Sequence, residues 1–316
     1  REFTCNHCSN ACQIQEFNVE GNKTYWGDKC SERFRRRTKS LQEPVTDDLM
    51  ALRQELLTDD SNIAQPPENA PVVGIPMTMF AYGQLPFWRT LLSKLGFATV
   101  LSTPTNKEII QAGQDAVVAE PCFPIVVAHG HIACLDRPDI DHILVPNIIS
   151  AEDMQTDIET HLCPWHQTLP FVARSAPALE QAARKFMSPQ VRFSEGPAFV
   201  TRELTRFFRS MGLKKSKIKS AVEAAFEAQH AFKRKCLQLG AEALDTLKRT
   251  GRRGVILVGR PYNLHDPGVN LSVARKLRQY YGVDCIPQDF LPTGDVDISE
   301  INNNMFWSLG RHVLGA

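Results

Sequence analysis

Residues 71–148 decide the fold of this chain, because short apolar runs alternate there with segments of helical character. In order, these runs are PVVGIP (71–76), LPFWRTLLSKLGF (85–97), ATVLS (98–102), NKEIIQAG (106–113), DAVVAE (115–120), FPIVVAHGHIACL (123–135) and DHILVPNI (141–148). Short β-branched runs separated by helices are typical of parallel strands joined by right-handed crossovers. The stretch therefore predicts a doubly wound α/β domain.

A second α/β unit is expected late in the chain. The run GVILVGR (254–260) indicates a buried strand, 269–281 a helix and 284–287 the start of another strand. Before it, the longest helix is expected from Ser216, as the N-cap, to about Arg249. We therefore expect a first α/β lobe at 72–190, a helical connector at 191–253 and a second, truncated lobe at 254–316.

The N-terminal part has a different character. Two polar-apolar runs flank residues 20–23, which predict a hairpin turn, and a helix is expected over 46–57. Residues 58–71 (TDDSNIAQPPENAP) are rich in proline and polar side chains and indicate a linker. We thus expect a cysteine-rich metal-binding module at 1–57. Because the chain begins at Arg1, we also expect it to be a piece of a longer protein.

Composition excludes several classes of partner. The 316 residues carry 36 basic and 35 acidic side chains, a formal net charge of +1, so no basic field would recruit nucleic acid or an anionic membrane. No apolar stretch is long enough to span a bilayer, and no signal peptide is evident. Nine cysteines, several of them clustered, favour metal ligation in a reducing compartment over a disulfide framework. We expect a cytoplasmic protein.

The first cysteine group combines Cys5, Cys8 and Cys12, spaced C-x2-C-x3-C, with Cys30 beyond the expected hairpin. Four thiolates held on tight turns suit Zn²⁺ or a [4Fe–4S] cluster, and the spacing does not choose between them. The order is the reverse of the radical-enzyme C-x3-C-x2-C motif. Unlinked thiols or two disulfides are the alternative to metal ligation. We expect these four residues to share one metal centre.

The second group is Cys122, in Glu-Pro-Cys-Phe-Pro after the expected strand 115–120, and Cys163, in Cys-Pro-Trp after DHILVPNI. Both are expected near the carboxyl ends of parallel strands, where open α/β sheets build ligand sites. A proline beside each thiol stiffens its loop. Two buried structural cysteines are the alternative. We expect the two thiols to face one crevice between the lobes and to ligate a second cluster.

The remaining candidates are weaker. Cys134, Cys236 and Cys285 lie inside apolar patterns and are expected to be structural. His129 and His131 are two residues apart on a helix and should point to different faces. Arg260 and Tyr262 end the late strand, and could hydrogen-bond an anionic ligand or a cluster sulfide; a solvated turn is the alternative. The catalytic residues are unknown, and no P-loop, dinucleotide fingerprint or nucleophile elbow is present.

Several blocks occur together in one order. They are GIPMTMFAYGQLPFWRTLLSKLGF (74–97), VLSTPTNKEII (100–110), EPCFPIVVAHGHI (120–132), ILVPNI (143–148), CPWHQTLPFV (163–172) and VGRPYNLHDPGVN (258–270). From about Val72 to the end, the chain thereby resembles the acyl-CoA dehydratase activase-related proteins of the DUF2229 type. These are related to the iron–sulfur subunits of 2-hydroxyacyl-CoA dehydratases and to double-cubane-cluster reductases.

The resemblance implies a two-lobed α/β protein that holds an iron–sulfur cluster, [4Fe–4S] or double-cubane, between its lobes. It implies low-potential electrons delivered by an ATP-hydrolysing activator module on the same or a separate chain, in an anaerobic setting. The resemblance assigns the role of cluster ligand to Cys122 and to Cys163. A further cysteine expected from the family's C-terminal part is not in this sequence.

Three functions remain open at this stage. An iron–sulfur electron-transfer component explains both cysteine groups. A non-catalytic interaction domain stabilised by zinc explains only the N-terminal group. An acyl-CoA dehydratase-like subunit would bind an acyl-CoA or another small substrate between the lobes. A homodimer is also compatible with the sequence, whereas it indicates neither a nucleic acid nor a membrane as partner.

Overall fold

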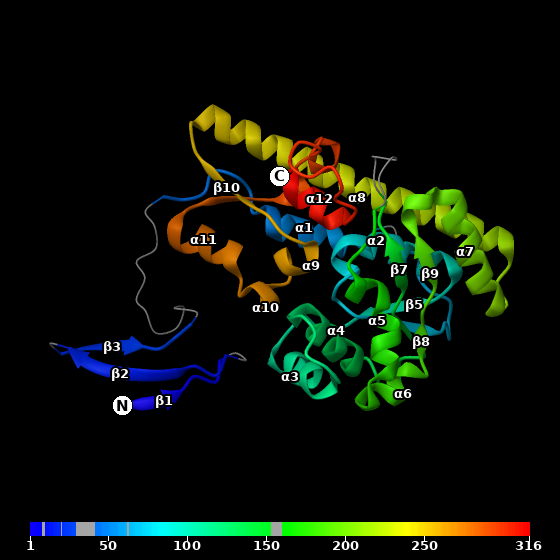
Figure 1. Ribbon diagram of the computed structural model, residues 1–316, viewed down its shortest axis with the longest axis horizontal. Coiled ribbons are helices and arrows are strands. Elements are labelled where there is room, and N and C mark those ends of the chain that lie inside the picture. The colour runs from blue at the N-terminus through cyan, green and yellow to red at the C-terminus, as the bar shows by residue number, and fades with distance from the viewer. Residues whose placement is uncertain (8–9, 20, 30–41, 62, 153–159) are drawn as a thin grey trace.

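The computed structural model describes residues 1–7, 10–19, 21–29, 42–61, 63–152 and 160–316 (Figure 1). Their architecture is mixed α/β: a parallel four-stranded sheet is flanked by helices, and a small antiparallel sheet lies at the N-terminus. This confirms the expected α/β class and the parallel sheet of the first lobe. The lobe and linker boundaries stay predictions.

The central sheet has the strand order β5-β4-β6-β8, with every pair parallel. Its strands are β4 (Val72–Ile75), β5 (Ala98–Leu101), β6 (His142–Leu144) and β8 (Phe186–Met187). The chain leaves β4 for β5 on one side and then returns to β6 on the other. The strand order thus reverses beside β4, which is where open α/β sheets leave a crevice at the carboxyl edge.

Two further strands, β7 (Asn147–Ser150) and β9 (Gln190–Arg192), continue β6 and β8 as a second parallel pair. The amide of Val145 donates to the carbonyl of Met187, and that of Asn147 to the carbonyl of Pro189. Pro146 and Pro189 have no amide hydrogen to add to the ladder. The sheet is therefore interrupted at these prolines rather than ended by them.

The first lobe's helices surround this sheet. They are α2 (Ala81–Leu95), α3 (Lys107–Ala116), α4 (Phe123–Cys134), α5 (Pro164–Ser175), η1 (Pro177–Leu179), α6 (Glu180–Ala183), η2 (Phe193–Glu195) and α7 (Gly196–Ser210). Helices α3 and α4 cross at two glycines. A Cβ on Gly130 would lie 1.9 Å from the carbonyl oxygen of Ile109, and one on Gly113 would lie 2.0 Å from that of Val126. Only glycine allows this close approach.

The prediction of a strand at 115–120 is wrong. Ala116 ends α3, and residues 117–122 form no strand. Val118 is 74% exposed, so this apolar run is not part of the sheet. The local sequence resembled a buried strand, but no neighbouring strand pairs with it among the described residues.

Helix α8 (Lys215–Thr250) is the long connector that the sequence predicts. It extends one residue beyond the expected range at either end, so the N-cap is Lys214 and not Ser216. Its buried face packs on α2 through an aromatic cluster, in which the ring centroid of Phe87 lies 5.2 Å from that of Phe226 and 5.1 Å from that of Phe193. Edge-to-face packing of this kind adds to the energy of burial.

The C-terminal part of the chain contains β10 (Gly254–Leu257) and β11 (Asp284–Pro287), which pair in parallel. Its helices are α9 (Pro261–Leu264), α10 (Pro267–Asn270), α11 (Val273–Tyr281), η3 (Gln288–Phe290), η4 (Thr293–Asp295) and α12 (Ser308–Leu314). Two expectations fail here. The helix expected at 269–281 is broken, because Leu271 and Ser272 have φ of 57° and 55°. Strand β10 is not buried: Val255 and Ile256 are 41% and 43% exposed, since within the described chain only β11 pairs with it.

The N-terminal sheet stands apart from the body in Figure 1. It contains β1 (Glu2–Thr4), β2 (Gln13–Val19) and β3 (Asn22–Trp26), and the β2–β3 pairing confirms the expected hairpin. Helix α1 (Leu49–Leu57) starts three residues later than expected, because the Asp48 carboxylate caps the amides of Met50 and Ala51. Thr46 instead hydrogen-bonds the buried carboxylate of Asp284.

Candidate metal centre

Three proline-headed turns place the candidate site residues. Cys122, Cys163 and Arg260 are the N-caps of α4, α5 and α9, with φ of −62°, −60° and −71° and ψ of 150°, 152° and 141°. A proline follows in the first turn of each helix. Pro164 and Pro261 disfavour helical backbone in Cys163 and Arg260 directly before them, whereas in α4 the proline is Pro124, the second residue of the helix. Local sequence thus repeats one backbone geometry at three points.

These turns meet around Arg260 and Tyr262. The guanidinium Nη1 of Arg260 donates to the Tyr262 hydroxyl oxygen at 3.0 Å. Burial opposes the charge of Arg260, but Tyr262 and the thiols of Cys163 and Cys122 outweigh it, so the pKa of Arg260 is raised. Burial, followed by Cys163, raises the pKa of Tyr262 to about 12. Both thiols therefore act on the same two side chains, which brings the second cysteine group and its expected partners together.

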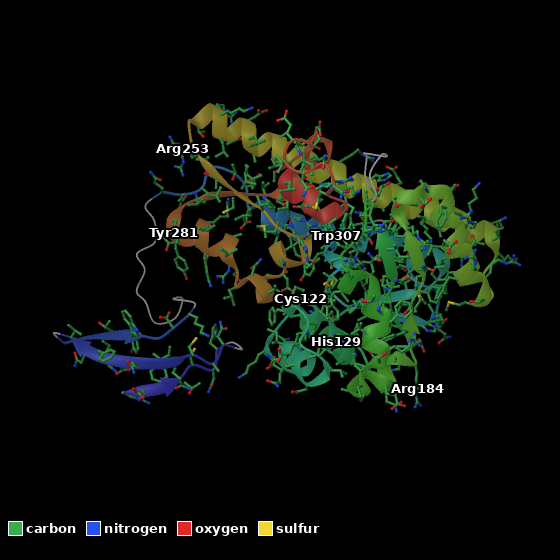
Figure 2. All side chains as sticks on the ribbon, in the orientation of Figure 1. Cys122, His129, Arg184, Arg253, Tyr281 and Trp307 are labelled. Atoms are coloured by element: carbon green, nitrogen blue, oxygen red, sulfur yellow. The ribbon has the colours of Figure 1, made fainter. Side chains whose placement is uncertain are left out.

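The two thiols differ in exposure. Cys122 is exposed and Cys163 is half-buried. Figure 2 labels Cys122 where the helices α3 and α4 approach α10. The expectation that Cys122 follows a parallel strand is wrong, since it starts a helix directly. The partial positive charge at the N-termini of α4 and α5 favours an anionic ligand near both sulfurs.

His166 lies one turn into α5, behind the thiols. Its ring centroid is 6.3 Å from that of Tyr262, and its side chain is buried. Burial, then the charge of Arg260, lowers the pKa of His166 to about 4. Neither of its ring nitrogens has a hydrogen-bond partner among the described residues. Sequence reasoning missed this histidine, because it lies among ordinary helical residues.

The donor set fits part of an iron–sulfur site. Two thiolates are soft ligands, and Arg260 and Tyr262 are the kind of neighbours that hydrogen-bond cluster sulfur. Within the described ranges, no group of three or more His, Cys, Asp and Glu side chains could hold a metal ion. This edge thus offers two of the four protein ligands that such a cluster takes.

The N-terminal cysteines are described only in part, because Cys8 and Cys30 lie outside the described residues. Cys5 and Cys12 extend the β1–β2 pairing: the amide of Cys5 donates to the carbonyl of Cys12 at 2.8 Å. Both are buried as free thiols beside Ile14. Two members of the expected quartet therefore lie side by side, and their sharing of one metal stays a prediction.

Within the described part of the chain, the three other cysteines belong to no group of side chains that could hold a metal ion. Cys236 and Cys285 are each 1% exposed, and burial raises their pKa values to about 12 and about 11. Cys134 is half-buried, and its thiol donates to the carbonyl of His131. These positions agree with a structural role.

The two histidines of α4 point in different directions, as their spacing predicts. The Nδ1 of His129 donates to the carbonyl of Ile125. His131 instead enters a buried chain, in which Ser102 Oγ accepts from the amide of Met77 at 2.8 Å and lies 2.7 Å from His131 Nδ1. Burial lowers the pKa of His131 to about 4, so the ring is neutral. Because the Thr105 hydroxyl gives its proton to Asp266, His131 Nε2 carries the ring proton and Nδ1 accepts from Ser102.

This chain of hydrogen bonds continues to Asp266, in the C-terminal part of the protein. His131 Nε2 donates to Thr105 Oγ1 at 2.9 Å, and the Thr105 hydroxyl donates to Asp266 Oδ2 at 2.6 Å. The Tyr82 hydroxyl also donates to Asp266. Burial raises the pKa of Asp266. A directed polar chain thus joins α4 to the segment that carries Arg260 and Tyr262.

A second polar link, between Arg53 and Asp289, was also missed. Arg53 of α1 is 2% exposed; its Nε donates to Asp289 Oδ2 and its Nη2 to the carbonyl of Tyr82 at 2.7 Å. Pro86 explains the second bond, because it removes the amide that would pair with the Tyr82 carbonyl inside α2. Asp289 Oδ1 accepts from His265 Nε2 at 3.1 Å. Burial disfavours the Asp289 carboxylate, but Arg53 and His265 outweigh it and lower its pKa.

Comparison with known protein families finds one match. The family described as CoA enzyme activase uncharacterised domain (DUF2229) matches residues 72–291. No curated protein and no solved structure matches the chain. Among the described helices, none combines the length and apolar character needed to cross a membrane.

Proposed function

The chain belongs to the CoA enzyme activase uncharacterised domain family, and on that premise we propose that it is an iron–sulfur electron-transfer component. The system it would serve is an ATP-dependent, low-potential reductase or 2-hydroxyacyl-CoA dehydratase activase-like system. One observation carries the proposal. Cys122 and Cys163 are separated by 40 other residues in the sequence, yet both lie near enough to Arg260 and Tyr262 to raise the pKa of these two side chains.

Each residue has a separate task in this proposal. The thiolates of Cys122 and Cys163 hold the cluster, [4Fe–4S] or double-cubane, and fix it at the junction of the two α/β lobes. Arg260 balances negative charge and Tyr262 donates a hydrogen bond, so both tune the reduction potential. When bound, the cluster supplies low-potential electrons. The half-buried Cys163 and the buried His166 restrict water on the inner side.

The partners follow from the same premise. An ATP-hydrolysing activator module, on the same or a separate chain, would deliver the electrons to the exposed side at Cys122. An acyl-CoA or another small molecule would receive them, and a homodimer is compatible with the arrangement. We place the system in the cytoplasm under anaerobic conditions.

The N-terminal group supports a second metal centre in the same protein. Cys5 and Cys12 are buried next to each other as free thiols, which favours ligation over solvent exposure. With Cys8 and Cys30 they would bind a [4Fe–4S] cluster or zinc. If zinc alone is found, the N-terminal part serves to stabilise an interaction domain.

The test is anaerobic reconstitution with iron and sulfide, followed by metal and acid-labile sulfide analysis and an electronic spectrum. Iron and sulfide should bind to the wild-type protein, and Cys122→Ser and Cys163→Ser should each remove the same share of both. Cys236→Ala is the matched control, since that buried thiol should contribute packing only.

A separate Cys5→Ser variant distinguishes the two centres, because it should leave the share that depends on Cys122 unchanged. Zinc without iron would contradict the electron-transfer proposal. So would iron that is retained in full after both Cys122→Ser and Cys163→Ser.

A further inference from the structure

A groove of about 440 Å³ adjoins the turns that carry the two thiols. One wall is formed by residues 117–121, and Pro121 directly precedes Cys122; the other is formed by α5, where Trp165 follows Cys163 by two residues. Helix α4 contributes the side chain of His129, which is labelled with Cys122 in Figure 2. The electron-transfer proposal assigns no task to this groove.

The walls of the groove are apolar and reach the surface. Val118 is 74% exposed, Phe171 59% and Trp165 36%. Residues 117–121 pair with no described strand, and their apolar side chains line the groove instead. Mostly apolar and aromatic walls with a few polar groups are typical of sites that bind small organic molecules. The apolar run that resembles a strand thus has a place in a candidate binding site.

One buried polar side chain lies in this apolar setting. His129 is 1% exposed, and its Nδ1 lies 2.8 Å from the carbonyl oxygen of Ile125. Burial lowers the pKa of His129, so the ring is neutral near pH 7. Because a carbonyl can only accept, Nδ1 carries the proton and Nε2 is an acceptor. This Nε2 has no partner among the described residues and, unlike both ring nitrogens of His166, is not fully enclosed.

The other polar side chains of the groove cannot satisfy this acceptor. The Thr168 hydroxyl donates to the carbonyl of Pro164 at 2.8 Å, and the Ser175 hydroxyl donates to that of Phe171 at 3.0 Å. Both protons are therefore used within α5. No charged side chain is among the described residues that line the groove. Since a charge is costly in such surroundings, an occupant should be uncharged and should bring its own hydrogen-bond donor.

From this geometry we propose that the groove binds a small, uncharged aromatic alcohol. Its hydroxyl donates to His129 Nε2, and its ring lies against Val118, Trp165 and Phe171. Aromatic walls favour an aromatic occupant, because ring pairs add to the energy of burial. The inference does not depend on a cluster at Cys122 and Cys163, because no thiol takes part in it.

The test uses calorimetric titration of the full chain with three probes that share one methylated ring: para-cresol, para-methylanisole and para-toluate. Para-cresol should bind about tenfold more tightly than either of the others, because only it offers a donor without charge. Its binding should also change the tryptophan fluorescence with the same affinity. Trp165→Phe should remove that change, which places the ligand in the groove.

Three further variants make the result decisive. His129→Phe keeps a ring but removes the acceptor, so it should weaken para-cresol binding about tenfold and leave para-methylanisole binding unchanged. His142→Phe, on β6 and outside the groove, is the matched control and should alter neither affinity. Ala119→Trp, at an exposed position of the first wall, should fill the groove and weaken both probes alike. It keeps the test valid if His129→Phe does not fold.

Several outcomes would overturn the proposal. Equal affinity for para-cresol and para-methylanisole would indicate a merely apolar surface, and tighter binding of para-toluate would indicate an anion site. A preference for para-cresol that persists in His129→Phe would show that another group accepts the hydroxyl. If no probe binds, water alone satisfies Nε2. Titrations of metal-free and iron-loaded protein should agree, so a failure to incorporate iron would sink the electron-transfer proposal and leave this one standing.

Discussion

Acidification should unfold this protein partly through His131. The imidazole is 0% exposed, and burial lowers its pKa to about 4, against an ordinary value near 6.5. Protonation at Nδ1 would also remove the acceptor of the hydrogen bond that Ser102 donates. The folded state therefore disfavours the charged imidazole, which the unfolded chain accepts freely.

Proton linkage gives the direction and the size of the change in the free energy of unfolding with pH. A histidine with a depressed folded pKa contributes its full stability above about pH 6.5, and this contribution is lost as the pH falls from 6.5 towards 4. At pH 5 the unfolded chain is mostly protonated at this site and the folded chain mostly is not. The free energy of unfolding should then be lower than at pH 7.5 by about 2 kcal/mol from this group alone.

The assay is urea unfolding at a series of pH values, compared between wild type and His131→Gln. Glutamine keeps one acceptor and one donor but does not titrate. The variant should lose about 2 kcal/mol less between pH 7.5 and pH 5 than the wild type does. Identical slopes would refute the reasoning, and so would an NMR titration that places the His131 pKa near 6.5 in the folded protein.

Three further predictions concern stability at neutral pH and are read from urea unfolding. Gly130→Ala should lower the free energy of unfolding by at least about 2 kcal/mol, because the new Cβ would meet the carbonyl of Ile109. The control Gly83→Ala meets nothing within 4 Å and should be neutral or stabilising. Equal losses of stability in the two variants would contradict this. Arg53→Met should cost about 3 to 5 kcal/mol, since it leaves Asp289 without its cation; a loss below 1 kcal/mol would show the pair to be dispensable. Asp284→Ala should cost about 2 to 4 kcal/mol, because three donors of residues 45–46 lose their buried acceptor; an unchanged midpoint would count against it.

Local pattern was enough for much of the fold. The parallel strands at 72–75 and 98–101, the long helix and the hairpin all carry their own signals: β-branched runs, a repeating apolar face and a turn with Gly21 at φ 79°. Cys122 and Cys163 could be singled out because prolines mark their turns. Each of these signals is carried by residues that are neighbours in the sequence.

The wrong predictions concern segments whose secondary structure depends on residues far away in the sequence. The run 115–120 has the composition of a buried strand, yet no described strand pairs with it, and Val118 remains exposed. No residue pattern in 269–281 predicts that Leu271 and Ser272 both adopt positive φ. Gly268 gives a tertiary reason for a tight turn nearby, since its Cβ would lie 2.6 Å from the carbonyl oxygen of Thr105.

The contacts of Arg53 show most directly why sequence reasoning could not find every buried polar residue. Pro86 is visible in the sequence, and inside a helix it implies that the carbonyl of Tyr82 needs another donor. Which donor answers that need is a tertiary fact: Arg53 comes from α1, before the expected linker, and its other partner, Asp289, lies 236 residues further along the chain. A helix assigned by sequence to the cysteine-rich module thus packs against the start of α2. The same guanidinium completes the hydrogen bonding of α2 and neutralises Asp289, so the contact between these three segments depends on one residue.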